Sequence, residues 1–509
     1  MNATMIETGI FSVLPPLIAI LLALVTKEVY LSLFVGLASG TVIYSFAAHE
    51  SLLTAVSRLF DMMASKISAN AYMILFLGLL WAVVELVAKS GGSEAYGRRA
   101  EKRLKSKKGA SLAAALLGII IFIDDGFNCL TVGTVMRPVF DRFRISREKL
   151  AYLLDATAAP VCILAPVSSW AVAVAGTIGN NGAGSGFSAF LSAIPFNLYA
   201  ILTILMVLFL ALSGRDFGPM KKAESLAASE KPSEPEKTET DGKKNGKVID
   251  LVLPVLMLIV FSILGMAYVG GFFEGVPFSD AIGENPTAGL TLGAFAALLT
   301  AAALYLPRKL MKPKAFLDTA VNGIGSIVPP LLVLILSWSL SGVCREMIGT
   351  GLFISSLVEK IGVSLRFLPF FVFLISAVMA FAMGSSWGTF SILIPIVSMI
   401  FAGSNGSAFF FPALGATLAG SVFGDHCSPI SDTTVLSSIG AGCGHLKHVE
   451  TQLPYALLTA ALSGFGYLLI AFSLPIALVL PLCALLLFLA VMVLGREKRG
   501  GEPKYFSKR

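Results

Sequence analysis

One stretch of fifteen residues decides how this chain must fold: Gly424–Ser438, which reads G-D-H-C-S-P-I-S-D-T-T-V-L-S-S. It contains Asp425, His426 and Asp432 and a helix-breaking proline, yet long apolar blocks flank it on both sides. An ionisable side chain at the centre of a bilayer costs about 2.5–3.5 kcal/mol on insertion scales. We therefore expect this stretch to bind something, and it is the first candidate for a functional site.

The composition predicts an all-α polytopic membrane protein. Of the 509 residues, 56% are hydrophobic and 14% are charged, whereas a soluble domain has about 25% charged residues. Apolar blocks of about twenty residues, such as Leu251–Val269 and Leu474–Leu494, predict membrane-spanning helices. The first ten residues lack a basic region, so we expect no cleaved signal peptide.

Several other functions are disfavoured. The net charge of +7 comes from short basic loops, which the positive-inside rule explains without a nucleic-acid partner. The six cysteines form no C-x-x-C and there are only four histidines, so we expect neither a disulfide framework nor a zinc site. No phosphate-binding G-x-x-x-x-G-K-[ST] is present, and no enzymatic activity is predicted.

Gly109–Pro138 is too short to cross the membrane twice. It lies between two basic loops, both expected in the cytoplasm, whereas two spans need about forty residues. We predict a re-entrant hairpin with Asp124-Asp125-Gly126 at its tip, and a surface helix at Leu52–Lys66. The five spans predicted in this half are Phe11–Thr26, Val29–Ala47, Ala71–Ala88, Leu150–Ala175 and Phe187–Leu212.

Residues 214–247 divide the chain. They hold eight Lys or Arg and seven Asp or Glu and almost nothing apolar, which predicts a disordered cytoplasmic linker. A second hairpin is predicted around Gly384–Thr389. The predicted units are a first membrane repeat (1–213), the linker, a second repeat (248–473), an extra C-terminal span (474–495) and a cytoplasmic tail (496–509).

The two halves are related by a duplication. A shift of 263 residues places Phe127 on Phe390 and Pro166–Ser169 on Pro429–Asp432. Basic loops flank the first hairpin only, so the second should enter from the other side, with the N-terminus outside and the C-terminus inside. Each half then has five spans, a re-entrant hairpin and a broken helix in inverted orientation, as in secondary transporters.

Six ionisable side chains are predicted to couple the movement of ions or protons: Asp124, Asp125, Asp155, Asp425, His426 and Asp432. In a low dielectric the adjacent pair Asp124 and Asp125 should not both ionise, so one pKa should be raised; the alternative is a solvated cytoplasmic turn. Asp155 is either a third carboxylate of the site or a partner of Arg137 or Lys149. His426 either takes part directly or pairs with Asp425.

Polar side chains at the four breaks are expected to bind the transported ion or solute: Asn128, Ser168, Ser169, Ser385, Ser386, Ser428, Ser431, Thr433 and Thr434. Hard oxygen ligands suit Na⁺, which we predict at Asp432, Ser431 and Thr433. Close packing of helices is the alternative role for the serines.

Four motifs resemble the NhaC family of sodium/proton antiporters, in the larger ion-transporter superfamily. They are D-D-G-F-N-C-L-T-V-G-T-V-M-R-P (Asp124–Pro138), R-E-K-L-A-Y-L-L-D-A-T-A-A-P-V (Arg147–Val161), A-P-V-S-S-W (Ala165–Trp170) and G-D-H-C-S-P-I-S-D-T-T (Gly424–Thr434). The resemblance implies an inverted-repeat fold with two re-entrant hairpins, elevator-like movement and a homodimer. Many members have an aromatic residue where this chain has Gly126.

The predicted function is Na⁺/H⁺ antiport by alternating access at a carboxylate site in the cell membrane. The site has several aspartates and no mid-membrane Lys or Arg, which favours a cation. The alternative is Na⁺-coupled transport or exchange of an amino acid or a carboxylate such as malate or lactate, which relatives of the family carry. Expected partners are the lipid bilayer, Na⁺, H⁺ and, under the alternative, that solute. Na⁺ is the transported or coupling ion, and no cofactor is expected.

Overall fold

Helices make up all the regular secondary structure that the computed structural model describes. The described residues are 5–26, 28–92, 95, 99, 104–178, 186–229, 246–278, 281, 285–353, 356, 364–402, 408–429 and 431–496. Within them, nine helices are long and apolar enough to cross a membrane. The prediction of an all-α, multi-pass membrane protein is therefore confirmed.

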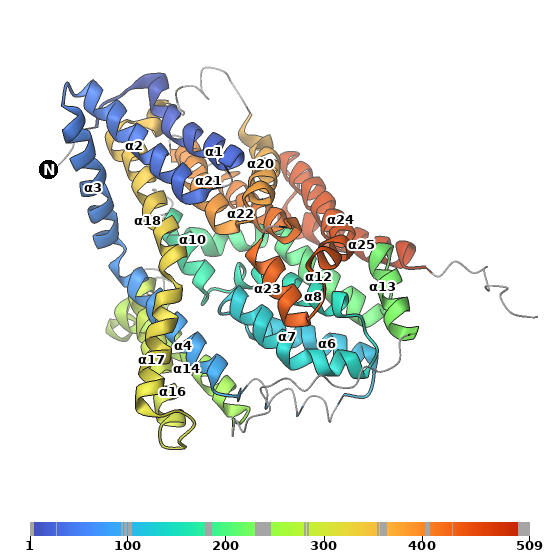
Figure 1. The fold of residues 1–509 in the computed structure, drawn as a ribbon. Helices are drawn as coiled ribbons and strands as arrows, with labels where there is room; N and C mark the ends of the chain where they lie inside the picture. Colours follow the sequence, from blue (N-terminus) through green and yellow to red (C-terminus); the bar gives the residue numbers. More distant parts are fainter. Residues whose placement is uncertain are drawn as a thin grey trace, which may run out of the picture.

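Two groups of helices lie beside the centre of the molecule (Figure 1). The first comprises α1 (Leu14–Thr26), α2 (Val29–Ala47), α3 (Leu52–Ala69) and α18 (Val328–Gly342). The second comprises α4 (Ala71–Lys89), α14 (Ile249–Val269), α16 (Pro286–Tyr305) and α17 (Pro313–Ser326). Each group takes helices from both halves of the sequence. The helix predicted for the membrane surface, α3, packs its apolar face on α2 and α18.

The two predicted hairpins are present as pairs of helices with a break between them. The first consists of α6 (Lys107–Ile120) and α7 (Asp125–Arg142), and the second of α20 (Leu368–Met383) and α21 (Ser386–Ala402). Gly384 turns the second break with φ +64°, a conformation that glycine adopts without steric cost. The stretch that contains α20 is long enough to span a membrane by itself. Re-entrance of either hairpin stays a prediction.

The two predicted broken helices are also present. One runs from α8 (Arg147–Thr157) through the short α9 (Ala159–Cys162) to α10 (Ser169–Ile178), and the other from α22 (Phe410–Cys427) to α23 (Asp432–Ala441). Prolines explain where the first segments end, because proline lacks the N–H and clashes with the preceding turn. Pro160 follows the end of α8 and Pro429 follows the end of α22.

The remaining helices cover the hairpins and broken helices. They are α11 (Gly186–Ala193), α12 (Leu198–Ser213), α24 (His445–Ala471) and α25 (Ile476–Leu494). In Figure 1 the hairpins, the broken helices and this cover form one body, with α7, α8 and α23 adjacent at its centre. The extra C-terminal span corresponds to α25.

The prediction of a disordered linker is wrong for its first part. Gly218–Ser229 forms α13, which packs on α8 and α24. Just before it, the buried Asp216 pairs with Lys149 at 2.7 Å, and Tyr455 Oη donates to the same carboxylate at 3.0 Å. Glu224 accepts from both the N–H and the hydroxyl of Ser146 at 2.7 Å. These partners lie far away in sequence. Residues 230–245, with most of the predicted tail, lie outside the described part of the chain.

Two glycines allow α7 and α23 to cross in direct backbone contact. A Cβ atom added at Gly133 would lie 2.5 Å from the carbonyl carbon of Gly440. We expect Gly133→Ala to force the two helices apart and to lower the free energy of unfolding by about 1–3 kcal/mol. A thermal melt of the purified protein measures this loss. The matched control is Gly325→Ala on α17, where a Cβ meets nothing within 4 Å; equal melting temperatures for the two variants would contradict the prediction.

Candidate ion-binding site

The tip of the first hairpin is bonded to the break of the first broken helix. Asp124 is buried and caps α7, where its Oδ1 accepts from the N–H of Phe127 at 3.0 Å. Its Oδ2 lies 3.5 Å from the hydroxyl of Ser169, and the N–H of Ser169 donates to the carbonyl of Ile123 at 3.1 Å. Asp125, the first residue of α7, is half-buried beside it. The alternative of a fully solvated turn is wrong for Asp124.

The second hairpin is bonded to the other broken helix in the reciprocal way. Ser386 Oγ donates to Asp425 Oδ2 at 2.7 Å, and the carbonyl of Ser421 is also within reach at 3.1 Å. In the first pair the hairpin supplies the carboxylate and the broken helix the hydroxyl; in the second pair these roles are exchanged. Ser385 caps α21 by accepting from the N–H of Gly388 at 3.1 Å.

The break between α22 and α23 presents the three side chains predicted to bind Na⁺. The hydroxyls of Ser431 and Thr433 lie 2.9 Å apart. Asp432 begins α23 and is exposed, and its Oδ1 accepts from the N–H of Thr433 at 3.0 Å. Ser428 instead donates to the carbonyl of Phe381 at 2.9 Å and anchors the break to α20.

Four carboxylates gather where the hairpin tips meet the broken helices, and we call them the carboxylate cluster: Asp124, Asp125, Asp425 and Asp432. They lie close enough for Asp432 to repel each of the other three. Within the described residues, none of the four forms an ion pair with a Lys or Arg. Asp124 and Asp425 are buried, whereas Asp125 is half-buried and Asp432 is exposed at the edge of the cluster. Buried carboxylates without a positive partner are costly, and the negative charges of the four repel one another, so this arrangement favours a bound cation or protons.

Two of the predicted ligands have structural roles. Asn128 Nδ2 donates to the carbonyls of Gly118, Ile121 and Thr157 at 2.7–3.0 Å and so ties the end of α6 to the end of α8. Of the two polar atoms of the Asn128 side chain, Oδ1 has no hydrogen-bond partner. Ser168 caps α10 by accepting from the N–H of Ala171 at 3.0 Å. These two residues shape the breaks.

Asp155 forms a second polar centre, on α8. Its Oδ2 lies within hydrogen-bond reach of Thr434 Oγ1 (3.3 Å), His448 Nε2 (3.2 Å) and Gln452 Nε2 (3.1 Å), which come from α23 and α24. His426 Nε2 lies 4.0 Å from the same oxygen. The alternative that pairs Asp155 with Lys149 is wrong, because Lys149 pairs with Asp216.

His426 has a different partner from the one considered in the sequence. Its Nδ1 lies 2.6 Å from the hydroxyl of Tyr199, and its ring lies nearly parallel to that of Tyr152. Tyr199, His448 and Gln452 were all missed by the sequence interpretation. His448 and Gln452 are four residues apart and therefore share one face of α24. Their spacing was the available signal, but H-L-K-H-V-E-T-Q has the composition of a loop.

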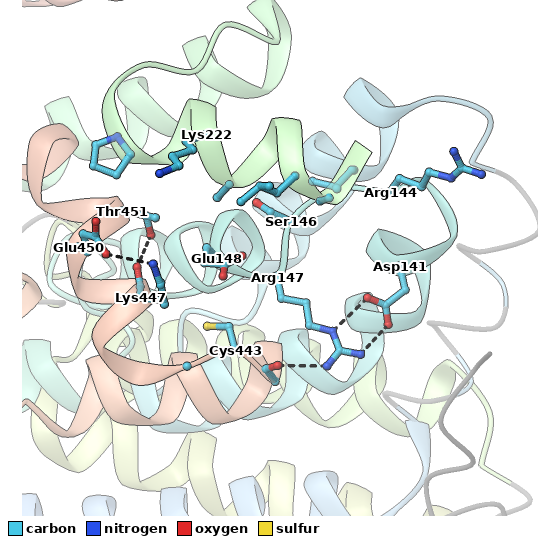
Figure 2. Close-up of a pocket in the computed structure, with 17 residues that line it drawn as sticks. Asp141, Arg144, Ser146, Arg147, Glu148, Lys222, Cys443, Lys447, Glu450 and Thr451 are labelled. Carbon is cyan, nitrogen blue, oxygen red and sulfur yellow. Dashed lines mark hydrogen bonds and ion pairs between the residues drawn. The ribbon is translucent and has the colours of Figure 1, made fainter. Parts of the chain in front are cut away.

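Two surface cavities flank this region without containing it. One, of about 590 Å³, lies between α13, the loop before α8 and the start of α24 (Figure 2). Arg147 lines this cavity and donates to Asp141 and to the carbonyl of Gly442. The other, of about 450 Å³, is lined by the ends of α3, α10 and α18. Neither cavity is lined by a predicted site residue.

A family model described as the Na⁺/H⁺ antiporter family matches residues 161–472 of this chain. A protein of Haemophilus influenzae described as uncharacterized is 37% identical over 485 residues, 92% of each chain. An uncharacterized Na(+)/H(+) antiporter of the same organism is 30% identical over 164 residues, 28% of this chain and 31% of that one. The malate-2H(+)/Na(+)-lactate antiporter of Bacillus subtilis is 33% identical over 164 residues, 30% of this chain and 33% of that one.

Among solved structures, the Alcanivorax borkumensis YdaH transporter superposes with a TM-score of 0.57 at 14% identity, over 84% of this chain and 91% of that one. At this level of identity the similarity shows a shared fold.

Proposed function

We propose that this chain, which belongs to the Na⁺/H⁺ antiporter family, exchanges Na⁺ for protons across the cell membrane at the carboxylate cluster. Membership of the family makes the chain a Na⁺-coupled transporter of the multi-pass membrane class. Two relatives with a named activity are antiporters. The exchange of Na⁺ for H⁺ alone, without an organic solute, is the finer part of the proposal.

The observation that carries the proposal is the carboxylate cluster without a Lys or Arg partner among the described residues. Either Na⁺ or protons can neutralise such a cluster, and each makes binding of the other less favourable. If the site can move across the membrane only with Na⁺ or protons bound, it carries Na⁺ in one direction and protons in the other. Na⁺ would be held by Asp432 with the hydroxyls of Ser431 and Thr433, since it prefers oxygen ligands.

The reciprocal bonds at the two breaks support the inverted repeat. Asp124 with Ser169, and Ser386 with Asp425, join one hairpin to one broken helix in each half. Each half thus joins its hairpin to its broken helix by a carboxylate–hydroxyl contact, as two copies of one unit would, although the bonded residues are not equivalent under the 263-residue shift. We propose that the hairpins and broken helices move together against the two outer groups of helices. This elevator-like movement would expose the site alternately to the outer side of the membrane, where the N-terminus is predicted, and to the cytoplasm. A homodimer stays a prediction.

A second candidate is Na⁺-coupled exchange of a small organic acid. α10 begins at Ser169, after the break of the first broken helix, and α21 begins at Ser386, after the break of the second hairpin. Helix N-termini favour anions. The partial match to the malate-2H(+)/Na(+)-lactate antiporter points the same way. Under this proposal the serines hold the solute carboxylate while Na⁺ binds at Asp432.

Transport by the purified full-length protein in proteoliposomes separates the two candidates. An inward Na⁺ gradient is imposed with no organic solute present, and a trapped pH indicator reports the interior. We expect the interior to become alkaline as protons leave in exchange for Na⁺. No proton movement from mildly acidic to alkaline pH, followed by movement once malate or lactate is added, would contradict Na⁺/H⁺ antiport and support the second candidate.

A further inference from the structure

A second buried polar centre lies at Asp155, separate from the carboxylate cluster. Asp155, His426, His448 and Gln452 are each at most 2% exposed, and they come from α8, α22 and α24. Gln452 Nε2 also donates to the backbone carbonyl of His426, so one amide joins α24 to the end of α22. Three separate helices thus converge on one buried carboxylate.

This centre has hydrogen-bonding capacity that the protein does not use. Four of its buried atoms have no hydrogen-bond partner: Asp155 Oδ1, His426 Nε2, His448 Nδ1 and Gln452 Oε1. Leaving a buried polar atom unpaired costs about 1–3 kcal/mol. The described residues supply no Lys or Arg to Asp155, so an imidazole proton is the positive charge that the centre can itself carry. Imidazole nitrogens are poor ligands for Na⁺, which favours a proton as the occupant.

A surface cavity lies within one helical turn of this centre along α24. Lys447 and Thr451 line the surface cavity of Figure 2, while His448 and Gln452, the next residues along α24, face inward. The rim residues Lys447 and Glu450 are exposed, so the cavity communicates with solvent. His448 is therefore the buried neighbour of residues that line a solvent-connected cavity.

Further titratable groups surround Asp155 and His448. The groups around them are Tyr152 of α8, Tyr199 of α12, His426 and Cys427 of α22 and Cys129 of α7, while α23 presents Thr434 and Ser437. Lys149 and Asp216 neutralise one another. Asp425 and Asp432 of the carboxylate cluster act on Asp155 by repulsion.

We propose that the pair Asp155–His448 carries a proton through the transport cycle in addition to those exchanged at the carboxylate cluster, so that more than one proton moves per Na⁺. The centre is linked to the cluster because Thr434, bonded to Asp155, lies one helical step from Thr433 on α23. The inference rests on the proposed Na⁺/H⁺ exchange.

The zero-flux condition in proteoliposomes measures the number of protons per Na⁺ without depending on the rate. The Na⁺ gradient and the membrane potential are fixed, and the pH gradient is varied until net movement stops. We expect more than one proton per Na⁺ in the unaltered protein and one proton fewer in His448→Gln. The matched control Ser437→Ala removes a hydrogen bond at 3.0 Å from His448 Nε2 but no proton, and should leave the ratio unchanged.

Two results would overturn the inference. One is a ratio of one proton per Na⁺ in the unaltered protein, a result that does not depend on the folding of any variant. The other is an unchanged ratio with a lower rate in His448→Gln, which would make His448 a structural residue. By contrast, the absence of any Na⁺-driven proton movement in the unaltered protein would contradict the proposed function itself.

Discussion

Asp432→Asn should abolish most of the Na⁺ dependence of proton movement. The asparagine keeps the shape of the side chain and can still accept from the N–H of Thr433, but it removes the negative charge expected to hold Na⁺. A hydrogen bond or contact to a charged group contributes about 1.5–3 kcal/mol, which corresponds to an affinity for Na⁺ weaker by about 10- to 150-fold. The measurement is the Na⁺ concentration that gives half-maximal proton movement in proteoliposomes.

The matched control for this substitution is Asp61→Asn, which changes an exposed aspartate on α3 away from the breaks. Because Asp432 is exposed and bonds only to its neighbour's N–H within the described residues, both variants should melt at the temperature of the unaltered protein. If Asp432→Asn kept the unaltered Na⁺ dependence, Asp432 would not be a ligand, and the site would have to be sought at Asp124 and Asp425.

Lys149→Met should cause the largest loss of stability. The ion pair of Lys149 with Asp216 is buried, with 6% and 7% of the two side chains exposed. Removing one partner leaves an uncompensated buried charge, which costs about 3–5 kcal/mol. We expect a lower melting temperature and release of α13 from α8, which increased proteolysis between residues 213 and 229 would report.

Two controls make this prediction specific. The double variant Lys149→Met/Asp216→Asn removes both charges but keeps an acceptor for Tyr455, and should recover most of the stability. Lys89→Met makes the same change in a pair with Glu85 that is 47% and 36% exposed, where the loss should be below about 1 kcal/mol. If Lys149→Met and Lys89→Met melted alike, the pair would not hold α13 in place.

The breaks could be predicted from sequence because local residues determine them. Pro160 and Pro429 follow the ends of α8 and α22, and Ser168 and Asp124 cap α10 and α7. The apolar blocks between the breaks are long enough to identify by composition alone. The structure has breaks between helices at the positions where these features predicted them.

The parts that the sequence did not predict depend on contacts between distant residues. The composition of α13 is that of a linker, and the helix is held by Asp216 with Lys149 and by Glu224 with Ser146. His448 belongs to the site because α24 begins earlier than its apolar block and turns one polar face towards Asp155. Neither set of contacts can be read from the neighbouring sequence, because the partners lie far away in the chain.

The central claim, that Na⁺ and protons compete for the carboxylate cluster, is tested most directly by proton release on Na⁺ binding. The purified protein is placed in lightly buffered detergent solution with a pH indicator, and NaCl is added against a matched addition of choline chloride. We predict that Na⁺ releases protons from the unaltered protein and far fewer from Asp432→Asn. Na⁺ binding without any proton release, at a pH where transport is active, would contradict the account.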